Sequence, residues 1–91
     1  MIKIKIDNLS LTVMGHADYA EHGKDIVCAG VSSLVNTLAL YAVEKGGRGE
    51  VSPGYAEIDC PRTKESEEVF ECIVNGLRGI GSAYPERVWF T

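Results

Sequence analysis

The spacing of apolar residues changes at Asp25, and this change constrains the fold more than any other feature of the sequence. Before Asp25, apolar residues occupy every second position in residues 2–6 and again in 9–13, on either side of an Asp-Asn turn pair. Alternation with a period of two is typical of strands that bury one face. Residues 2–13 therefore predict a β-hairpin.

After Asp25, apolar residues recur every three or four positions, which is the spacing of a helix that packs on a core. This stripe consists of Val27, Val31, Leu34, Val35, Leu38 and Ala42. Asp25 stands where an N-cap residue is expected. The other flank of the helix is apolar as well, through Ile26, Ala29, Ala39 and Val43. We therefore expect the helix to be covered over much of its circumference.

The remaining sequence predicts one more helix and two more strands. Residues 46–54 hold four glycines and a proline and are interpreted as a flexible, turn-rich connection, and 55–59 as a strand. Residues 66–77 have the stripe of an amphipathic helix, and 88–90 form a last strand. The order β-β-α-β-α-β predicts an α+β fold, a single domain over residues 1–91 with a mostly antiparallel sheet of about four strands packed by two helices.

Length and charge exclude several classes of protein. With 91 residues there is room for one domain. Thirteen acidic residues against nine basic ones give a net charge of −4, which opposes a phosphate backbone, so we expect no direct nucleic acid binding. The N-terminus alternates lysine with isoleucine and lacks the apolar core of a secretory signal. We expect no segment to reach the ~18 apolar residues of a membrane span, and we therefore expect a cytoplasmic protein without membrane contact.

The three cysteines predict free thiols. Cys28, Cys60 and Cys72 are odd in number and form no CxxC pair, which gives little support to a disulfide framework or a zinc site. We expect no metal and no cofactor. Cys60 and Cys72 have no histidine nearby in sequence and are interpreted as packing residues.

Residues 15–32 carry the chemistry of this sequence. His16 follows a strand, a loop bounded by Gly15 and Gly23 comes next, and Cys28 lies in the first turn of the helix. With Asp25 as the N-cap, Cys28 is the third helical residue, near unpaired backbone N–H groups. Helix N-termini and a nearby imidazolium both favour the thiolate form of a cysteine, which is the nucleophilic form. Cys28 is therefore a candidate nucleophile.

Each of these residues also fits a purely structural role. Cys28 could pack in the core, His16 could bond the backbone at a strand end, Asp25 could act only as a cap, and Ser32 could bond back to the preceding turn. Their combination favours a nucleophilic site. His22, in the loop, is the competing base, but His16 is preferred because a strand end holds an imidazole more firmly. Asp25 could also orient the imidazole, and Ser32 shares the helical face of Cys28.

The pattern GHAxYA…GxDIVCAxVS, which runs from Gly15 to Ser32, resembles the ribosomal-processing cysteine protease family (Prp, or YsxB-like). The resemblance implies a small α+β homodimer that removes an N-terminal extension from a large-subunit ribosomal protein precursor. It implies Cys28 as the nucleophile, His16 as the general base, and Asp25 and Ser32 in supporting positions.

The resemblance also implies a mobile loop over the site, which takes in Gly15, His22 and Gly23. The substrate it implies is an extended peptide with apolar and aromatic residues before the cut. Tyr19, Tyr41 and Tyr55 are candidate walls of its pocket. One departure is visible, because Gly30 stands where family members often carry alanine, and a glycine costs about 1 kcal/mol in a helix.

Two other classes of function remain open at this stage. A non-catalytic ribosome-associated binding or assembly factor would not need the thiol of Cys28. A redox-sensing thiol protein would need a resolving cysteine nearby, which the spacing of Cys60 and Cys72 does not indicate.

Overall fold

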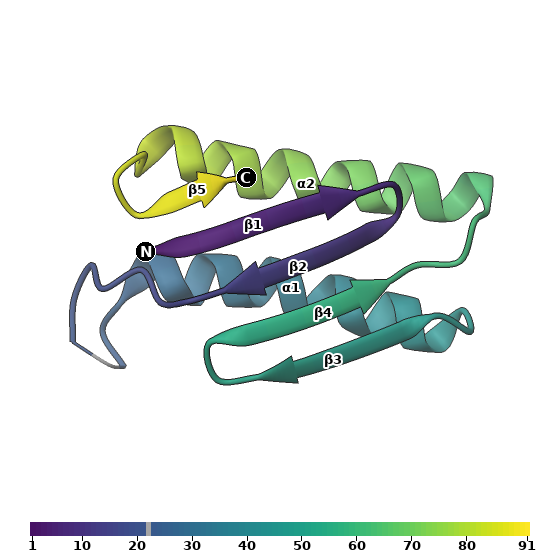
Figure 1. Ribbon diagram of the computed structural model, residues 1–91, viewed down its shortest axis with the longest axis horizontal. Helices are drawn as coiled ribbons and strands as arrows, with labels where there is room; N and C mark the ends of the chain where they lie inside the picture. The colour runs from purple at the N-terminus through teal and green to yellow at the C-terminus, as the bar shows by residue number, and fades with distance from the viewer. Residues whose placement is uncertain (22) are drawn as a thin grey trace.

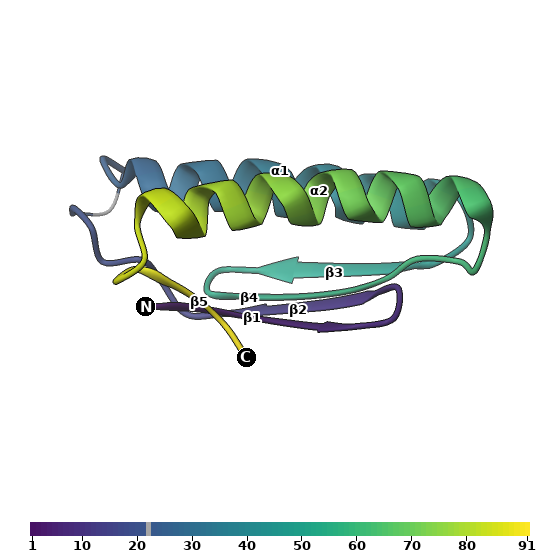
Figure 2. The same ribbon diagram turned by 90° about the horizontal axis from the view of Figure 1, so that it is seen from above.

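The computed structural model describes residues 1–21 and 23–91. Within this part of the chain, two helices lie side by side on one face of a five-stranded sheet (Figures 1 and 2). The elements in chain order are β1 (Ile2–Asp7), β2 (Ser10–Met14), α1 (Ile26–Glu44), β3 (Arg48–Ser52), β4 (Tyr55–Asp59), α2 (Lys64–Ala83) and β5 (Val88–Phe90).

The strand order is β3-β4-β2-β1-β5. Neighbouring strands run antiparallel except β1 and β5, which are parallel, with Ile4 of β1 opposite Phe90 of β5. The α+β class, the mostly antiparallel sheet and the β1–β2 hairpin are thereby confirmed. Because β2 lies between β1 and β4, the end of β2 is central in the sheet. The next element along the chain is α1.

The described chain has one strand more than the sequence predicted, so the order is ββαββαβ and the sheet has five strands instead of about four. The prediction that residues 46–54 are only a flexible connection is wrong, because Arg48–Ser52 forms β3. This strand lies at the sheet edge and is largely exposed, so it lacks the alternation that marks a half-buried strand. Its glycine allows a close approach to α1, since a Cβ on Gly49 would lie 2.8 Å from the carbonyl oxygen of Ala39.

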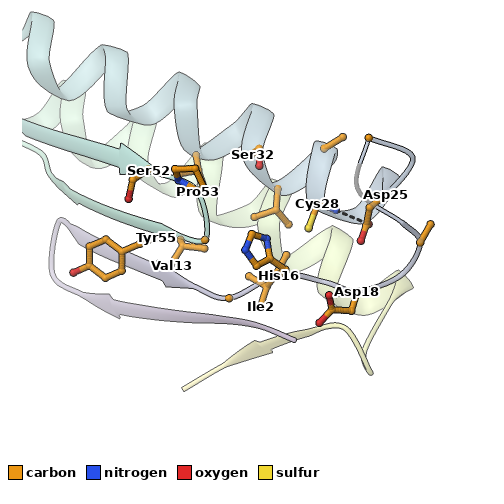
Figure 3. Close-up of a pocket in the computed structure, with 17 residues that line it drawn as sticks. Ile2, Val13, His16, Asp18, Asp25, Cys28, Ser32, Ser52, Pro53 and Tyr55 are labelled. Carbon is orange, nitrogen blue, oxygen red and sulfur yellow. Dashed lines mark hydrogen bonds between the residues drawn. The ribbon is translucent and has the colours of Figure 1, made fainter.

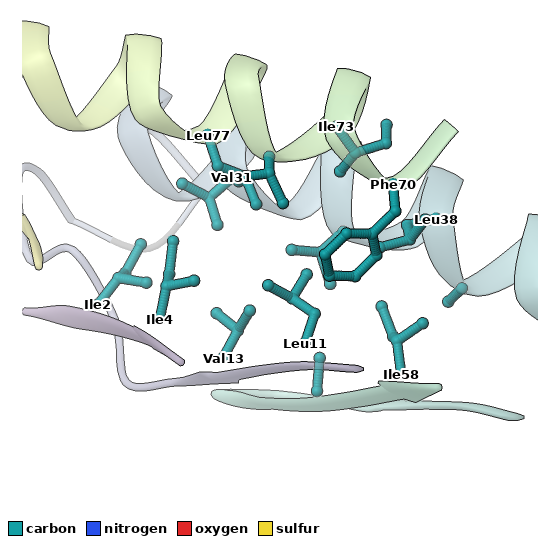
Figure 4. Close-up of a cluster of buried hydrophobic side chains, with 14 of the residues drawn as sticks. Ile2, Ile4, Leu11, Val13, Val31, Leu38, Ile58, Phe70, Ile73 and Leu77 are labelled. Carbon is teal, nitrogen blue, oxygen red and sulfur yellow. The ribbon is translucent and has the colours of Figure 1, made fainter. Parts of the chain in front are cut away.

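The core lies between the sheet and the two helices (Figure 4). Its largest fully buried apolar side chains are Ile4, Leu11, Leu38, Ile58 and Leu77, which come from β1, β2, α1, β4 and α2. Burying such a side chain contributes about 1.5–3 kcal/mol. All of these elements are therefore locked together, and the first turn of α1 is held beside the end of β2.

One face of α1 remains open to solvent, which differs from the expectation that the helix is covered over much of its circumference. Val27, Val31 and Ala39 are buried, but Ile26 and Val43 are 60% and 57% exposed. By length and composition α1 would suffice to cross a membrane, with a mean hydropathy of 1.8, so the expectation that no segment reaches this length and composition is wrong. The core helix of a small domain has the same composition, and the buried face of α1 packs in the core.

Candidate active site

A cavity of about 590 Å³ lies where β2 ends, α1 begins and the β3–β4 turn approaches them (Figure 3). The candidate residues on its wall are Gly15, His16, Gly23, Asp25, Cys28 and Ser32. The fold thus brings together residues from the strand end, the loop and the helix. His22 lies outside the described residues.

The first turn of α1 is organised by Asp25, which is the N-cap as predicted. Its Oδ1 accepts hydrogen bonds from the backbone N–H groups of Val27 (3.0 Å) and Cys28 (2.9 Å). Desolvation acts to raise the pKa of Asp25, but the hydrogen bonds from the backbone N–H groups of Cys28 and Tyr19 outweigh it and hold this pKa below its usual value. Asp25 is therefore a carboxylate, and Cys28 is the third residue of the helix.

The sulfur of Cys28 has a donor of its own. Cys28 is half-buried, and its Sγ accepts a hydrogen bond from the backbone N–H of Ala17 at 3.1 Å. The N-terminus of a helix also favours negative charge. The sulfur thus lies at the start of the helix beside a backbone N–H donor, and Cys28 borders the cavity.

His16 also lines the cavity and rests against the β3–β4 turn. The Gly15 N–H donates to the carbonyl oxygen of Gly54 at 2.9 Å, which joins the end of β2 to this turn. A Cβ on Gly54 would lie 2.8 Å from Nε2 of His16, so the ring packs directly on the backbone of Gly54, whose φ is +74°. The imidazole is therefore held in place by the turn.

His16 and Cys28 face the same cavity without a direct bond (Figure 3). Among the described residues no hydrogen bond joins the two side chains. Catalytic hydrogen bonds are often long in proteins without substrate and tighten in the complex. The arrangement gives a thiol and an imidazole access to the same bond of a molecule in the cavity.

The loop before α1 is anchored by residues from the C-terminal part of the chain, which sequence reasoning missed. Nη1 of Arg87 donates to the carbonyl oxygen of Asp18 at 2.7 Å, and the ring of Tyr84 meets that of Tyr19 edge-on, with centroids 5.3 Å apart. The Tyr19 N–H donates to Oδ2 of Asp25 at 2.9 Å. No local signal could have indicated Arg87 or Tyr84, because these contacts span more than sixty positions of the sequence.

Apolar side chains line much of the cavity. They are Ile2, Val13, Val31 and Val35, and the ring of Tyr55 also borders it. Of the three tyrosines proposed as walls, Tyr55 alone is in that position. Tyr41 lies elsewhere and donates a hydrogen bond to Oε1 of Glu65 at 2.6 Å. The lining suits an apolar segment of a ligand.

All three cysteines, each within the described residues, are free thiols as predicted. Cys60 is 7% exposed, which confirms its packing role, and burial together with the nearby charge of Asp59 raises its pKa. The packing role predicted for Cys72 is wrong, because this residue is exposed on α2. Cys28 is thus the thiol that borders the cavity.

An α+β domain that presents a thiol at a helix N-terminus and an imidazole across one cavity has the groups that a thiol-dependent hydrolase uses. A family model described as cysteine protease Prp matches residues 1–89. The chain belongs to this family of cysteine proteases, which confirms the resemblance seen in residues 15–32.

Curated relatives carry the same description. The chain is similar to the ribosomal processing cysteine protease Prp of Mycoplasma genitalium, with 33% identity over 91 aligned residues that cover 97% of this chain and 92% of the relative. It is also similar to the protein of that name from Bacillus subtilis, with 59% identity over 27 residues, which cover 30% of this chain and 24% of the relative.

Solved structures share the fold. The ribosomal processing protease Prp of S. aureus, in complex with a covalently linked product peptide, superposes with a TM-score of 0.80 at 22% identity, covering 99% of this chain and 95% of that one. A protein from Streptococcus mutans superposes with a TM-score of 0.73 at 25% identity, covering 99% and 90%. The arrangement of two helices on a five-stranded sheet is therefore common to these proteins.

Proposed function

We propose that this protein is a processing endopeptidase that removes an N-terminal extension from the precursor of a large-subunit ribosomal protein. Cys28 is the nucleophile of this reaction and His16 its general base. The family, and relatives named as ribosomal processing proteases, support this substrate. The enzyme acts in the cytoplasm, where ribosomal proteins are made.

The chemistry follows from the two groups on the cavity wall. His16 takes the proton of the thiol, and the Sγ of Cys28 attacks the carbonyl carbon of the scissile bond. The tetrahedral intermediate collapses as the protonated His16 gives its proton to the leaving amine. Water, deprotonated by His16, then attacks the thioester and releases the carboxylate product and the thiol. No cofactor enters these steps.

One observation carries this proposal, namely that the Sγ of Cys28 meets a backbone N–H donor and borders the same cavity as His16. A cysteine that only packs in the core would not border an open cavity. The apolar lining fits the apolar residues expected before the cut. A related protease from S. aureus has been solved with a substrate peptide, so this fold holds peptides in that protein.

The test is cleavage of the precursor encoded in the same genome, with products identified by mass spectrometry. Cys28→Ala and His16→Ala should each abolish cleavage while circular dichroism shows an unchanged fold. Cys72→Ala is the matched control for the loss of a thiol, and His22→Ala is the control for the loss of an imidazole. Both controls should cleave normally.

Retained cleavage in Cys28→Ala or His16→Ala would reject the assigned pair. The alternative, a non-catalytic ribosome-associated assembly factor, is tested in cells. If Cys28→Ser supports growth and normal ribosome assembly while the precursor stays uncut, the thiol is dispensable and the assembly role is favoured.

The protein is further proposed to act as a homodimer that pairs through the exposed face of α1. This face has the 3-4-3-4-3 spacing of a helix–helix seam, formed by Ile26, Ala29, Ser33, Asn36, Leu40 and Val43, all of them exposed. Residues 26–43 contain no charged side chain. A second copy would cover this apolar stripe, and the small residues in it would allow close packing.

Light scattering tests the dimer. Wild-type protein should have twice the mass of the 9.9 kDa chain, and Leu40→Glu should dissociate it, because Leu40 is 74% exposed and lies at the seam. Trp89→Glu is the control, since Trp89 is a comparably exposed apolar residue on β5, and it should remain dimeric. A wild-type species of 9.9 kDa would contradict the proposal.

A further inference from the structure

A peptidase of this kind must hold negative charge on the carbonyl oxygen of its tetrahedral intermediate, and backbone N–H groups at the start of a helix such as α1 are natural donors to it. The structure shows those donors already paired. Oδ1 of Asp25 accepts from the N–H groups of Val27 and Cys28, and the N–H of Ala29 donates to the carbonyl oxygen of Asp25. The N–H groups around the nucleophile within the helix are thus engaged.

Another backbone N–H points at the reacting atom. The N–H of Ala17 lies 3.1 Å from Sγ of Cys28, and Ala17 is 1% exposed, so water does not compete for it. This residue follows His16 directly, which places the donor and the general base on the same short segment. Once a carbon–sulfur bond forms, the carbonyl oxygen is two bonds from Sγ. A donor within hydrogen-bond distance of Sγ can then also reach that oxygen, provided that the carbonyl is oriented toward Ala17.

We propose that the backbone N–H of Ala17 first stabilises the thiolate of Cys28 and then donates to the oxyanion of the tetrahedral intermediate. This inference rests on the proposed peptidase function. When the sulfur lone pair forms the bond to carbon, the π electrons of the carbonyl move to oxygen, and the negative charge moves from sulfur to that oxygen. The same N–H group then donates to the oxygen that carries the negative charge.

The backbone conformation on both sides of Ala17 orients this N–H toward Sγ of Cys28. Gly15 has a φ of +95°, and a Cβ there would overlap the carbonyl oxygen of Met1. Asp18 has the left-handed φ of +53°, which is uncommon for a residue other than glycine. Strained backbone of this kind persists where the surroundings hold it and often marks a functional segment.

Two contacts hold Asp18 in this conformation. Nη1 of Arg87 donates to its carbonyl oxygen at 2.7 Å, and the N-terminal ammonium of Met1 lies 3.7 Å from its carboxylate. On the far side of Asp18, the N–H of Tyr19 donates to Asp25. The left-handed residue thereby turns the N–H groups on both of its sides toward the start of α1.

The direct test replaces this one N–H by an ester oxygen. Residues 1–27 are synthesised with lactic acid in place of Ala17 and joined to residues 28–91 by native ligation, for which Cys28 supplies the natural junction. The matched control carries the α-hydroxy analogue of tyrosine at Tyr19, which deletes an N–H of the same loop that bonds Asp25 instead of Sγ. A ligated all-amide protein is the reference.

The ester at 17 should lower kcat for precursor cleavage by at least about a hundredfold, as loss of an oxyanion donor does, with little change in KM. It should also move the alkylation of Cys28 to higher pH, because the thiolate loses its donor. The ester at 19 should change kcat much less and should leave the alkylation profile in place. Circular dichroism checks that all three proteins are folded.

Activity of the ester at 17 within about threefold of the all-amide protein, or an equal loss in both esters, would overturn the assignment to Ala17 and leave the peptidase function standing. An all-amide protein that cleaves no precursor would overturn the proposed function and the oxyanion role with it. If, in addition, the ester at 17 and the all-amide protein show the same pH dependence of Cys28 alkylation, donation from the N–H of Ala17 to the sulfur is overturned as well.

Discussion

Replacing Asp25 by alanine should cost stability and, more severely, activity. The carboxylate accepts three hydrogen bonds, two from the first turn of α1 and one from the N–H of Tyr19 in the loop. Loss of an N-cap costs about 1 kcal/mol and loss of a further hydrogen bond about 1 kcal/mol. The free energy of unfolding should therefore fall by roughly 2 kcal/mol, which lowers Tm by roughly 8–16 °C in a domain of this size.

Thr63→Ala is the control that separates the loss of stability in Asp25→Ala from its loss of activity. Thr63 is the N-cap of α2, where its side chain accepts from the N–H of Ser66 at 3.1 Å. This variant should lose about 1 kcal/mol of stability and keep its activity below its melting temperature. Asp25→Ala should lose activity at the same temperature, because the turn that carries Cys28 is no longer fixed.

Asp25→Asn distinguishes capping from loop anchoring. Asparagine caps a helix as well as aspartate does, but its NH2 group cannot accept the N–H of Tyr19. This variant should keep most of the stability and show a modest loss of cleavage activity, similar to that of the ester at position 19, because both changes remove the bond between Asp25 and the N–H of Tyr19. Differential scanning calorimetry and precursor cleavage measure the two quantities. Full activity in Asp25→Asn and Asp25→Ala would refute the reasoning that this carboxylate organises the site.

The same carboxylate sets an acid limit for the site. Hydrogen bonding holds the folded-state pKa of Asp25 below its unfolded value of about 3.9, so its contribution to stability is complete above that value. The contribution is lost as the pH falls through the folded-state pKa. Wild-type protein should destabilise more than Asp25→Asn when the pH falls from 5 to 3, as thermal melts would show. Equal losses of stability in the wild-type protein and in Asp25→Asn would contradict the assignment of this pH dependence to Asp25.

Three further outcomes follow from the geometry of the site. Iodoacetamide should modify Cys28 faster than the exposed Cys72, as measured by peptide mapping, and equal rates would indicate an ordinary thiol. Gly54→Ala should impair cleavage, because its Cβ would lie 2.8 Å from the ring nitrogen of the imidazole, and a fully active variant would contradict that contact. Gly30→Ala should raise the free energy of unfolding by up to about 1 kcal/mol in a denaturant titration, since its Cβ meets only the terminal Cδ1 of Ile80, 3.2 Å away. A loss of stability there would show that Ile80 cannot move aside.

Local interactions explain what the sequence could predict. The hairpin of β1 and β2 follows from alternation, and the start of α1 follows from Asp25, because an N-cap bonds residues two and three positions further on. The position of Cys28 in the first helical turn follows from the same cap. These features depend on neighbours in the chain, so a short window of sequence contains their cause.

Contacts between distant segments explain what it could not predict. β3 is specified by pairing with β4 and by the close approach of Gly49 to α1, and neither leaves a periodic pattern in residues 48–52. The anchoring of the loop by Arg87, and the packing of Gly54 under His16, join residues 38 or more positions apart. Such contacts are known only once the fold is known.

The proposed reaction depends on a bond between the Sγ of Cys28 and the substrate. The most direct measurement uses a peptide that matches the end of the precursor's extension and carries a chloromethyl ketone in place of the scissile bond. Intact mass and peptide mapping should find one adduct, located on Cys28, with slower labelling in His16→Ala and none in Cys28→Ala. Labelling of Cys72 at an equal rate, or no adduct on Cys28 in a protein that cleaves the precursor, would contradict the account.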